Sequence, residues 1–242
     1  MKNLFAAIRF ITILPAGRSE HFDAMGMVPW FPIVGLLLGM LLAAFDLAAS
    51  HLWPVSAVSI LDVILLAILT GAFHLDGLGD TADGLFSHRP RERILEIMKD
   101  SRIGVMGVVA VVSVLAVKWA GIGGLGANRT ALLILVPAYA RCGILFGIRA
   151  LDYGRPQGGT GFAFFSRALR LRDFWALIPV GIFSLVLGQH ALTLAIGFAA
   201  ITAALVAYYR WRLGCITGDM LGAMTEVTEA GLFLLAAAGG LR

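Results

Sequence analysis

The chain has 242 residues, of which 59% are apolar, and its mean hydropathy is +0.88. Only 14% of the residues are charged, against about 25% in soluble domains, so the composition excludes an ordinary soluble protein and indicates an integral membrane one. The formal net charge of +4 does not indicate nucleic-acid binding, because the basic residues lie between the apolar segments, where membrane proteins carry them.

The apolar segments, taken in chain order, predict a helical membrane protein. Residues 4–14 are apolar but too short to span a bilayer, and with Arg9 and Arg18 they favour an interfacial amphipathic helix. A bilayer core needs about 20 apolar residues per helix. The expected spans are residues 31–50, 55–73, 103–120, 130–149, 174–188, 190–208 and 220–240.

The expected number of spans is six or seven. Segment 174–188 is short, contains Gly181 and Gly188, and is also compatible with a re-entrant segment. No soluble domain, linker or repeat is evident in the sequence. We therefore predict an all-α fold, a polytopic integral membrane helix bundle, in which residues 1–242 form a single membrane-embedded domain.

The basic residues also predict an orientation in the lipid membrane. With seven spans, fifteen of the nineteen Lys and Arg residues fall on one side, two fall on the other, and Lys118 and Arg141 lie within spans. Positive charge is concentrated in cytoplasmic loops. We therefore expect a multi-pass protein of the cell (inner) membrane whose loops 74–102 and 150–173 face the cytoplasm.

The N-terminal segment and the cysteines predict nothing unusual. Residues 1–14 carry a basic residue and an apolar stretch, but no typical cleavage site follows, so a cleavable signal peptide is not expected. Cys142 and Cys215 lie within or beside apolar segments and lack the spacing of a metal site. We expect no disulfide between them.

The most informative motif follows the second span, where residues 74–84 read His-Leu-Asp-Gly-Leu-Gly-Asp-Thr-Ala-Asp-Gly. Asp76, Asp80 and Asp83 are spaced i, i+4 and i+7, which places them on one face of a helix. Three like charges repel one another there, and a hard divalent cation, Mg²⁺ or Mn²⁺, removes that repulsion. His74 either orients an aspartate or lies at the membrane interface. The structural alternative is a polar loop that caps the preceding span.

A second polar motif, residues 96–104, precedes the third span and contains Lys99, Asp100, Ser101 and Arg102. Basic side chains next to acidic metal ligands suit a phosphate whose charge they share with the metal. Ser101 is a candidate N-cap for a helix that begins at Arg102. The alternative is a juxtamembrane basic segment that contacts lipid headgroups.

A third motif opens the last apolar segment. Asp219 and Glu226 are seven residues apart, and Glu226 and Glu229 are three apart, so these carboxylates share one helical face. Carboxylates that run into an apolar segment are costly and usually functional. We expect the two acidic motifs to face each other near the cytoplasmic interface, around more than one metal ion.

Weaker candidates lie outside these three motifs. A Gly-rich loop around Arg155 is a candidate phosphate cradle, although it lacks the Walker pattern. Arg141, inside the fourth span, is expected to point at the site, because facing lipid would be costly. Asp62 is a candidate partner for Arg141 or Lys118, and Asp46 lies near a predicted helix end.

Together these motifs resemble the cobalamin synthase family, the adenosylcobinamide-GDP ribazoletransferases, over nearly the whole chain. The loop at Arg155 departs from the Arg-Pro-x-Gly-Leu-Gly form that is common in that family. The segments that carry the resemblance are residues 10–15 (Phe-Ile-Thr-Ile-Leu-Pro), 31–39, 71–84, 96–104 and 217–223, with Glu226 and Glu229.

The resemblance implies an integral membrane, Mg²⁺-dependent transferase that acts late in cobalamin assembly. Its substrates would be adenosylcobinamide-GDP and α-ribazole or the 5′-phosphate of α-ribazole. A hydroxyl of the riboside would attack the phosphorus on the cobinamide side, and GMP would leave. The residues alone indicate a membrane protein, a divalent metal and an anionic phosphate substrate, but they do not identify the corrinoid.

Roles follow for the residues that match the family's motifs. Lys99 and Arg102 would contact phosphate oxygens. Either Asp83 or Glu226 would accept the hydroxyl proton. The implied metal ligands are Asp76, Asp80, Asp83 and Asp219. The implied substrate-binding residues are His74, Asp100, Ser101, Arg141, Arg155 and Glu229.

Two other functions fit part of the pattern. A CDP-alcohol phosphatidyltransferase also carries aspartates and glycines at helical spacing, but its Asp-Gly is followed by Ala-Arg, whereas residues 83–84 are followed here by Leu85 and Phe86. A cation-coupled transporter would use the carboxylates as ion sites. The acidic residues cluster instead at one interface beside basic ones, which favours an enzyme.

Overall fold

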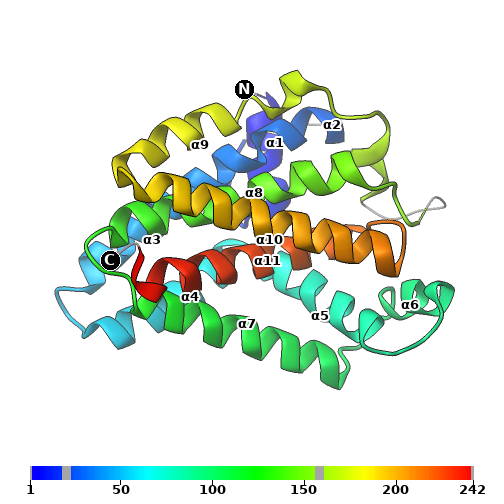
Figure 1. Ribbon diagram of the computed structural model, residues 1–242, viewed down its shortest axis with the longest axis horizontal. Coiled ribbons are helices and arrows are strands. Elements are labelled where there is room, and N and C mark those ends of the chain that lie inside the picture. The colour runs from blue at the N-terminus through cyan, green and yellow to red at the C-terminus, as the bar shows by residue number, and fades with distance from the viewer. Residues whose placement is uncertain (1, 18–22, 156–160, 241–242) are drawn as a thin grey trace.

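The computed structural model describes residues 2–17, 23–155 and 161–240, and within these ranges every regular element is a helix (Figure 1). The helices are α1 (Lys2–Ile11), α2 (Ala24–Met27), α3 (Phe31–Ala49), α4 (Val55–Leu69), α5 (Phe73–Leu85), α6 (Arg91–Ile97), α7 (Val105–Gly123), α8 (Arg129–Ala150), α9 (Leu177–Ser184), α10 (His190–Arg212) and α11 (Gly218–Leu235). Short 3-10 or π turns cover Val28–Trp30, Phe162–Phe165, Leu171–Phe174, Leu185–Leu187 and Ala236–Gly240.

The long helices lie side by side as a bundle, with α1, α2 and α9 along one flank (Figure 1). The all-α prediction is therefore confirmed. Cys142 and Cys215 are both buried and free.

Five helical segments are long and apolar enough to span a membrane, and a sixth is counted if α4 and α5, which meet at 90°, form one span. The higher expected count of seven is not reached among the described residues. Segment 174–188 contains only the eight-residue α9 and short 3-10 turns, which is too short for a bilayer core. The five segments are Ala24–Ala49, Val105–Gly123, Arg129–Ala150, His190–Arg212 and Gly218–Ala238.

Helix α8 lies at the centre of the bundle. In its most apolar window 83% of the residues are buried, against 22% in α7 and 17% in α10, so the latter two helices face the lipid. Helix α3 packs closely on α8 at Gly35, where a Cβ atom would lie 2.6 Å from Ala138 Cα. Small residues at such crossings let two backbones approach each other. Helix α11 packs against the other side of α8 and is thereby held in place.

The chain turns sharply between α4 and α5. Gly71 and Ala72 have positive φ angles of 59° and 55°, in the left-handed region that is unfavourable for residues with a Cβ atom. Position 71 requires glycine for a second reason, since a Cβ atom there would lie 2.9 Å from Ile13 Cγ2. The turn ends α4 after 15 residues and directs α5 against α11.

Loops that are far apart in the sequence meet at one end of the bundle. Arg91 Nε donates to the Leu213 carbonyl (2.7 Å), and Arg210 Nη2 donates to the Ala150 carbonyl (2.8 Å). The loops that follow α5, α8 and α10 therefore share this end, on the right in Figure 1. They carry most of the basic residues that the sequence places between spans.

The opposite end of the bundle holds a separate buried ion cluster. Arg129 Nε lies 2.8 Å from Asp46 Oδ1, and Arg129 Nη2 lies 3.0 Å from Asp62 Oδ2. The expected pairing of Asp62 with Arg141 or Lys118 is therefore wrong. Arg129 begins α8 at the depth of Asp62, whereas Arg141 lies about three turns further along the helix.

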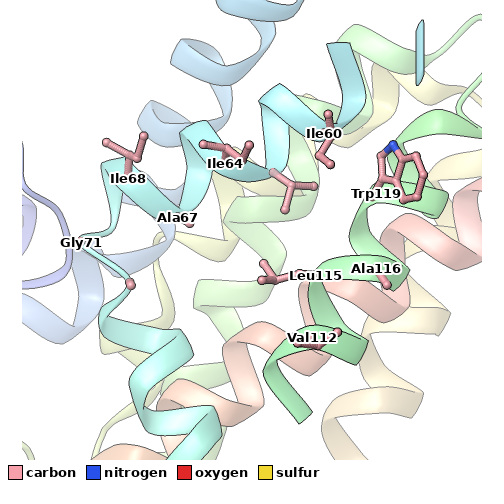
Figure 2. Close-up of a pocket in the computed structure, with 11 residues that line it drawn as sticks. Ile60, Ile64, Ala67, Ile68, Gly71, Val112, Leu115, Ala116 and Trp119 are labelled. Carbon is pink, nitrogen blue, oxygen red and sulfur yellow. The ribbon is translucent and has the colours of Figure 1, made fainter. Parts of the chain in front are cut away.

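An apolar groove of about 600 Å³ runs between α4 and α7 (Figure 2). Its lining consists of aliphatic side chains, two residues of the α4–α5 turn and the Trp119 ring. The Trp119 indole N–H donates to the Ser56 carbonyl (3.0 Å). Both helices are apolar, so the groove faces the bilayer, and its lining offers no group for acid, base or metal chemistry.

Candidate active site

Helices α5 and α11 cross at two glycines. A Cβ atom at Gly77 would lie 2.8 Å from the Asp219 carbonyl oxygen, and one at Gly222 would lie 3.2 Å from the His74 carbonyl oxygen. The glycines within the first and third motifs therefore let the two backbones touch. The crossing brings the first acidic motif next to the start of the third one.

Three carboxylates gather around this crossing. Asp76 is exposed, and Asp80 and Asp219 are half-buried. Asp76 and Asp80 lie about one turn apart on α5, and Gly77 between them abuts the backbone of Asp219. The Thr217 hydroxyl accepts a hydrogen bond from the Met220 N–H (3.2 Å) and caps α11, so Asp219 lies in the first turn, at the positive end of the helix dipole.

Arg155 supplies positive charge to this cluster. Its Nη2 lies 2.7 Å from Asp219 Oδ2, and both side chains are mostly buried. The loop that carries Arg155 is held beside α11 because the Gly154 N–H donates to the Ile216 carbonyl (2.9 Å). The part of the Gly-rich loop that departs from the family's form, residues 156–160, lies outside the described residues.

Asp83, the third member of the first motif, binds the N-terminus of α7. Its Oδ2 accepts from the Gly104 N–H (2.6 Å), and its Oδ1 accepts from the Gly107 N–H (2.8 Å). A carboxylate in this place satisfies amides that have no partner within the helix and interacts favourably with the helix dipole. Both oxygens are engaged in positioning α7, which does not favour the expected roles of Asp83 as metal ligand or base.

The second motif lies on the exposed segment between α6 and α7. Lys99, Asp100, Ser101 and Arg102 are all exposed. Arg102 Nη2 lies 2.7 Å from Asp100 Oδ2, and the side-chain and backbone hydrogen bonds from Arg102 lower the pKa of Asp100 to about 2. The N-cap role expected for Ser101 is wrong, because α7 begins at Val105, three residues later than predicted.

The two glutamates further along α11 form a buried ion network. Lys118 Nζ of α7 lies 2.6 Å from Glu226 Oε2 and 2.5 Å from Glu229 Oε2. Arg141 of α8 pairs with the other oxygen of Glu229. All four side chains are buried, and their charges balance, which is the condition under which ions are tolerated inside a membrane protein.

The two glutamates of this network lie away from the acidic cluster. Glu226 and Glu229 lie roughly 10 and 15 Å along α11 from Asp219, at 1.5 Å per residue. Arg141 and Glu229, expected to contact substrate, contact each other, and Glu226, expected as a base, is held by Lys118. The position of Lys118 within a predicted span could have indicated this network, because a lysine inside a membrane requires an acidic partner at the same depth.

Among the described residues, no three His, Cys, Asp or Glu side chains come close enough to hold a metal ion by themselves. Mg²⁺ is usually bound by one or two carboxylates together with water and substrate phosphate. Asp76, Asp80 and Asp219 offer oxygen donors of this kind, and Arg155 offsets only part of their negative charge. The donor set therefore suits a cation that the substrate helps to bind.

His74 is 2% exposed and lines a small apolar pocket beside the start of α11. Within the described part of the chain, His74 Nδ1 has no hydrogen-bond partner. The side chain therefore lies inside the protein and not at its surface.

The fold and the site together define a class of protein. It is a polytopic α-helical membrane protein in which acidic and basic side chains converge at one end of the bundle. Such an arrangement is typical of enzymes that transfer phosphate-containing groups, because cations and metal-binding carboxylates stabilise the charge that develops.

The chain belongs to the cobalamin-5-phosphate synthase family, which it matches over residues 3–238. The adenosylcobinamide-GDP ribazoletransferase of Roseiflexus sp. (strain RS-1) is 37% identical over 228 residues, which cover 92% of this chain and 84% of that protein. The protein of the same name from Herpetosiphon aurantiacus is 37% identical over 236 residues, with 95% and 93% covered. That from Clostridium novyi is 33% identical over 246 residues, with 98% and 96% covered. No solved structure matches the chain significantly.

Proposed function

We propose that the protein is an adenosylcobinamide-GDP ribazoletransferase of cobalamin biosynthesis. It joins α-ribazole, or the 5′-phosphate of α-ribazole, to adenosylcobinamide-GDP and releases GMP. The observation that carries the proposal is the α5–α11 crossing, where Asp76, Asp80 and Asp219 gather with Arg155. Relatives named for this reaction match over most of their length, which supports it.

In this reaction a hydroxyl oxygen of the riboside attacks the phosphorus next to cobinamide. The bond between that phosphorus and the bridging oxygen breaks, and GMP leaves with the negative charge. The hydroxyl proton passes to a base. Catalysis of such a transfer depends on holding two substrates in line and on stabilising the charge that develops.

We assign Asp76, Asp80 and Asp219 as the carboxylates that would hold Mg²⁺ together with water and the phosphate oxygens of the substrate. Their oxygens are the donors that Mg²⁺ prefers, and their excess negative charge is only partly offset by Arg155. Mg²⁺ bound there would neutralise charge on the diphosphate. Asp83 stays outside this set, because both of its oxygens accept hydrogen bonds from α7 amides.

Basic side chains near the cluster are assigned to the phosphates. Arg155 already contacts Asp219. Lys99 and Arg102 lie on the exposed segment that leads into α7. Arg102 is paired with Asp100 and would exchange that partner for a phosphate oxygen, which a guanidinium group binds in bidentate geometry.

The proton acceptor is assigned to the acidic cluster. Glu226 is 3% exposed and held by Lys118, and Asp83 is engaged by backbone amides. Asp76 and Asp80 retain exposure to solvent beside the crossing, so whichever of the two does not bind the metal is in position to accept the proton.

We also propose that the site faces the cytoplasm from the inner membrane. The loops after α5, α8 and α10 meet at the same end of the bundle as the acidic cluster. These loops are rich in Lys and Arg, and such loops are retained on the cytoplasmic side.

GMP release tests the proposed reaction. Membranes that contain the protein are supplied with adenosylcobinamide-GDP, α-ribazole and Mg²⁺, and GMP and the corrinoid product are measured together. We expect equal amounts of both, dependent on both substrates, and neither product in membranes without the protein. A CDP-alcohol phosphotransferase or a cation-coupled transporter would release no GMP from this substrate.

A further inference from the structure

A small pocket beside the acidic cluster is lined mainly by aromatic and aliphatic side chains. Phe10, Phe31, Phe73 and Phe164 surround His74 there. The Phe10 ring centroid lies 5.0 Å from that of Phe164 and 5.5 Å from that of Phe73, and the Phe73 ring lies 5.5 Å from the His74 ring. The lining comes from α1, α3, α5, α8, α11 and the Phe162–Phe165 turn.

We propose that this pocket binds the aromatic base of α-ribazole, an inference that rests on the proposed function. The base is a flat, largely apolar bicyclic ring that has one ring nitrogen free to accept a hydrogen bond. Aromatic side chains bind such a ring in offset or edge-to-face contacts. The polar contact would come from His74.

His74 is suited to that contact because its Nδ1 atom is buried and has no hydrogen-bond partner among the described residues. The whole residue is 2% exposed. A buried polar atom in that state is costly and calls for a partner. A neutral imidazole has one N–H to donate, and the free nitrogen of the base would accept it.

The pocket and the acidic cluster share two helices. Gly218 and Gly222 line the pocket and lie on either side of Asp219 in the α11 sequence, and a Cβ atom at Gly222 would lie 3.2 Å from the His74 carbonyl oxygen. A base held in the pocket would therefore place its ribose near Asp219, at the α5–α11 crossing.

The size and polarity of the pocket determine which ring of the two substrates it can bind. Its volume of about 50 Å³ is far below the roughly 300–1,000 Å³ of sites that hold whole ligands, and it is also smaller than a bicyclic base. The base would therefore enter only when the Phe73 side chain, at a residue that is 45% exposed, turns outward. A corrin, which is several times larger than the base, is excluded even then. Guanine is disfavoured because its edge carries several polar groups, whereas among the described residues that line the pocket only His74 has a polar side chain.

Binding and kinetics of three variants test the pocket. His74→Gln and Phe164→Leu alter the lining, and Phe146→Leu is a matched control because Phe146 packs on Phe174 and Phe198 instead. Binding of α-ribazole to the full-length protein in detergent is measured by equilibrium dialysis. Loss of one such contact should weaken binding and raise the KM for α-ribazole about ten-fold, with the KM for adenosylcobinamide-GDP unchanged and Phe146→Leu like wild type.

Other outcomes would overturn the pocket assignment. A rise in the KM for adenosylcobinamide-GDP alone would place guanine in the pocket. Unchanged binding in both pocket variants, or equal losses in Phe146→Leu, would mean that the phenylalanines only pack. Free 5,6-dimethylbenzimidazole provides a test that needs no variant: it should compete with α-ribazole on the wild-type protein. Dialysis does not depend on turnover, so absence of GMP release would refute the proposed function without deciding the pocket.

Discussion

Acidic residues with similar spacing on α5 and α11 have different roles because their surroundings differ. Asp76 is exposed and Asp80 is half-buried, and Asp219 beside them is paired with Arg155. Glu229 is enclosed by cations from two other helices. An open carboxylate can bind a metal or a proton, whereas an enclosed one holds helices together.

Lys118→Met removes one cation from four balanced buried charges. Removing one partner of a buried ion pair costs about 3–5 kcal/mol, so we expect a markedly lower Tm in detergent. Adding Glu226→Gln restores charge balance with Arg141 and Glu229, and the double variant should melt above Lys118→Met alone. A double variant that melts below both single variants would contradict a charge-balanced network.

Asp83→Asn tests whether this residue positions α7 or holds metal. The variant keeps the side-chain shape but loses the charge at the helix N-terminus, which should cost about 0.5–2 kcal/mol of stability. The Mg²⁺ concentration that gives half-maximal GMP release should not change. A large increase in that concentration, with stability unchanged, would show that Asp83 binds the metal.

At the scale of elements, the α5–α11 crossing determines whether a site exists at all. The 90° turn at Gly71 and Ala72 brings α5 against α11, and the glycines at the crossing allow contact between the backbones. Asp76 and Asp80 therefore reach Asp219 only if both features are kept.

Gly77→Ala should disturb this crossing. The added Cβ atom would lie 2.8 Å from the Asp219 carbonyl oxygen, and overpacking of this kind typically costs about 1–3 kcal/mol. We expect a lower Tm and a loss of GMP release. Gly181→Ala is the matched control, because a Cβ atom there meets nothing within 4 Å, and it should behave like wild type. Full activity in Gly77→Ala would show that the contact is not needed.

Hydropathy predicted most of the elements. The spans expected at 103–120 and 130–149 correspond to Val105–Gly123 and Arg129–Ala150. The span expected at 55–73 ends instead at Leu69, because the turn that follows depends on a positive φ at Ala72, and an alanine gives no sign of that in the sequence. Segment 174–188 is apolar enough but too short.

Candidate site residues could be predicted where several carboxylates within one motif had the spacing of a single helical face. The three aspartates of the first motif and Asp219 of the third were identified as metal donors, which stays a prediction, and the structure brings the helix that carries Asp76 and Asp80 against the start of α11 at Asp219. The partner of Glu226 was not predictable, since Lys118 is 108 residues away and only the packing of α7 on α11 sets their common depth. The capping role of Asp83 depends in the same way on where α7 begins.

At the scale of the whole molecule, charge is distributed unevenly between the two ends of the bundle. The end with the acidic cluster also holds the long basic loops, whereas the other end has the buried Arg129 cluster and the short turn between α3 and α4. This asymmetry is the basis for placing the site in the cytoplasm.

Cysteine labelling tests that orientation. Cys142 and Cys215 are buried and would first be replaced by serine. Ser166→Cys lies in the long basic loop, and Leu52→Cys lies in the turn at the other end, where Leu52 is 72% exposed. An impermeant thiol reagent added to intact cells should label Leu52→Cys but not Ser166→Cys, and permeabilisation should expose both. The reverse labelling pattern would show that the protein has the opposite orientation in the membrane.

If the carboxylates at the α5–α11 crossing form the active site, removing the charge of one of them should nearly abolish the reaction. Asp80→Asn does so, because the variant keeps the size of the side chain and removes only its charge, and GMP release is the measurement. Glu92→Gln is the matched control, since Glu92 is an acidic residue on α6 whose side chain is 78% exposed. Loss of a ligand to a catalytic metal predicts a fall in rate of at least about 100-fold in Asp80→Asn and a wild-type rate in Glu92→Gln. A wild-type rate in Asp80→Asn, at the same protein level in the membrane, would show that these carboxylates do not form the active site.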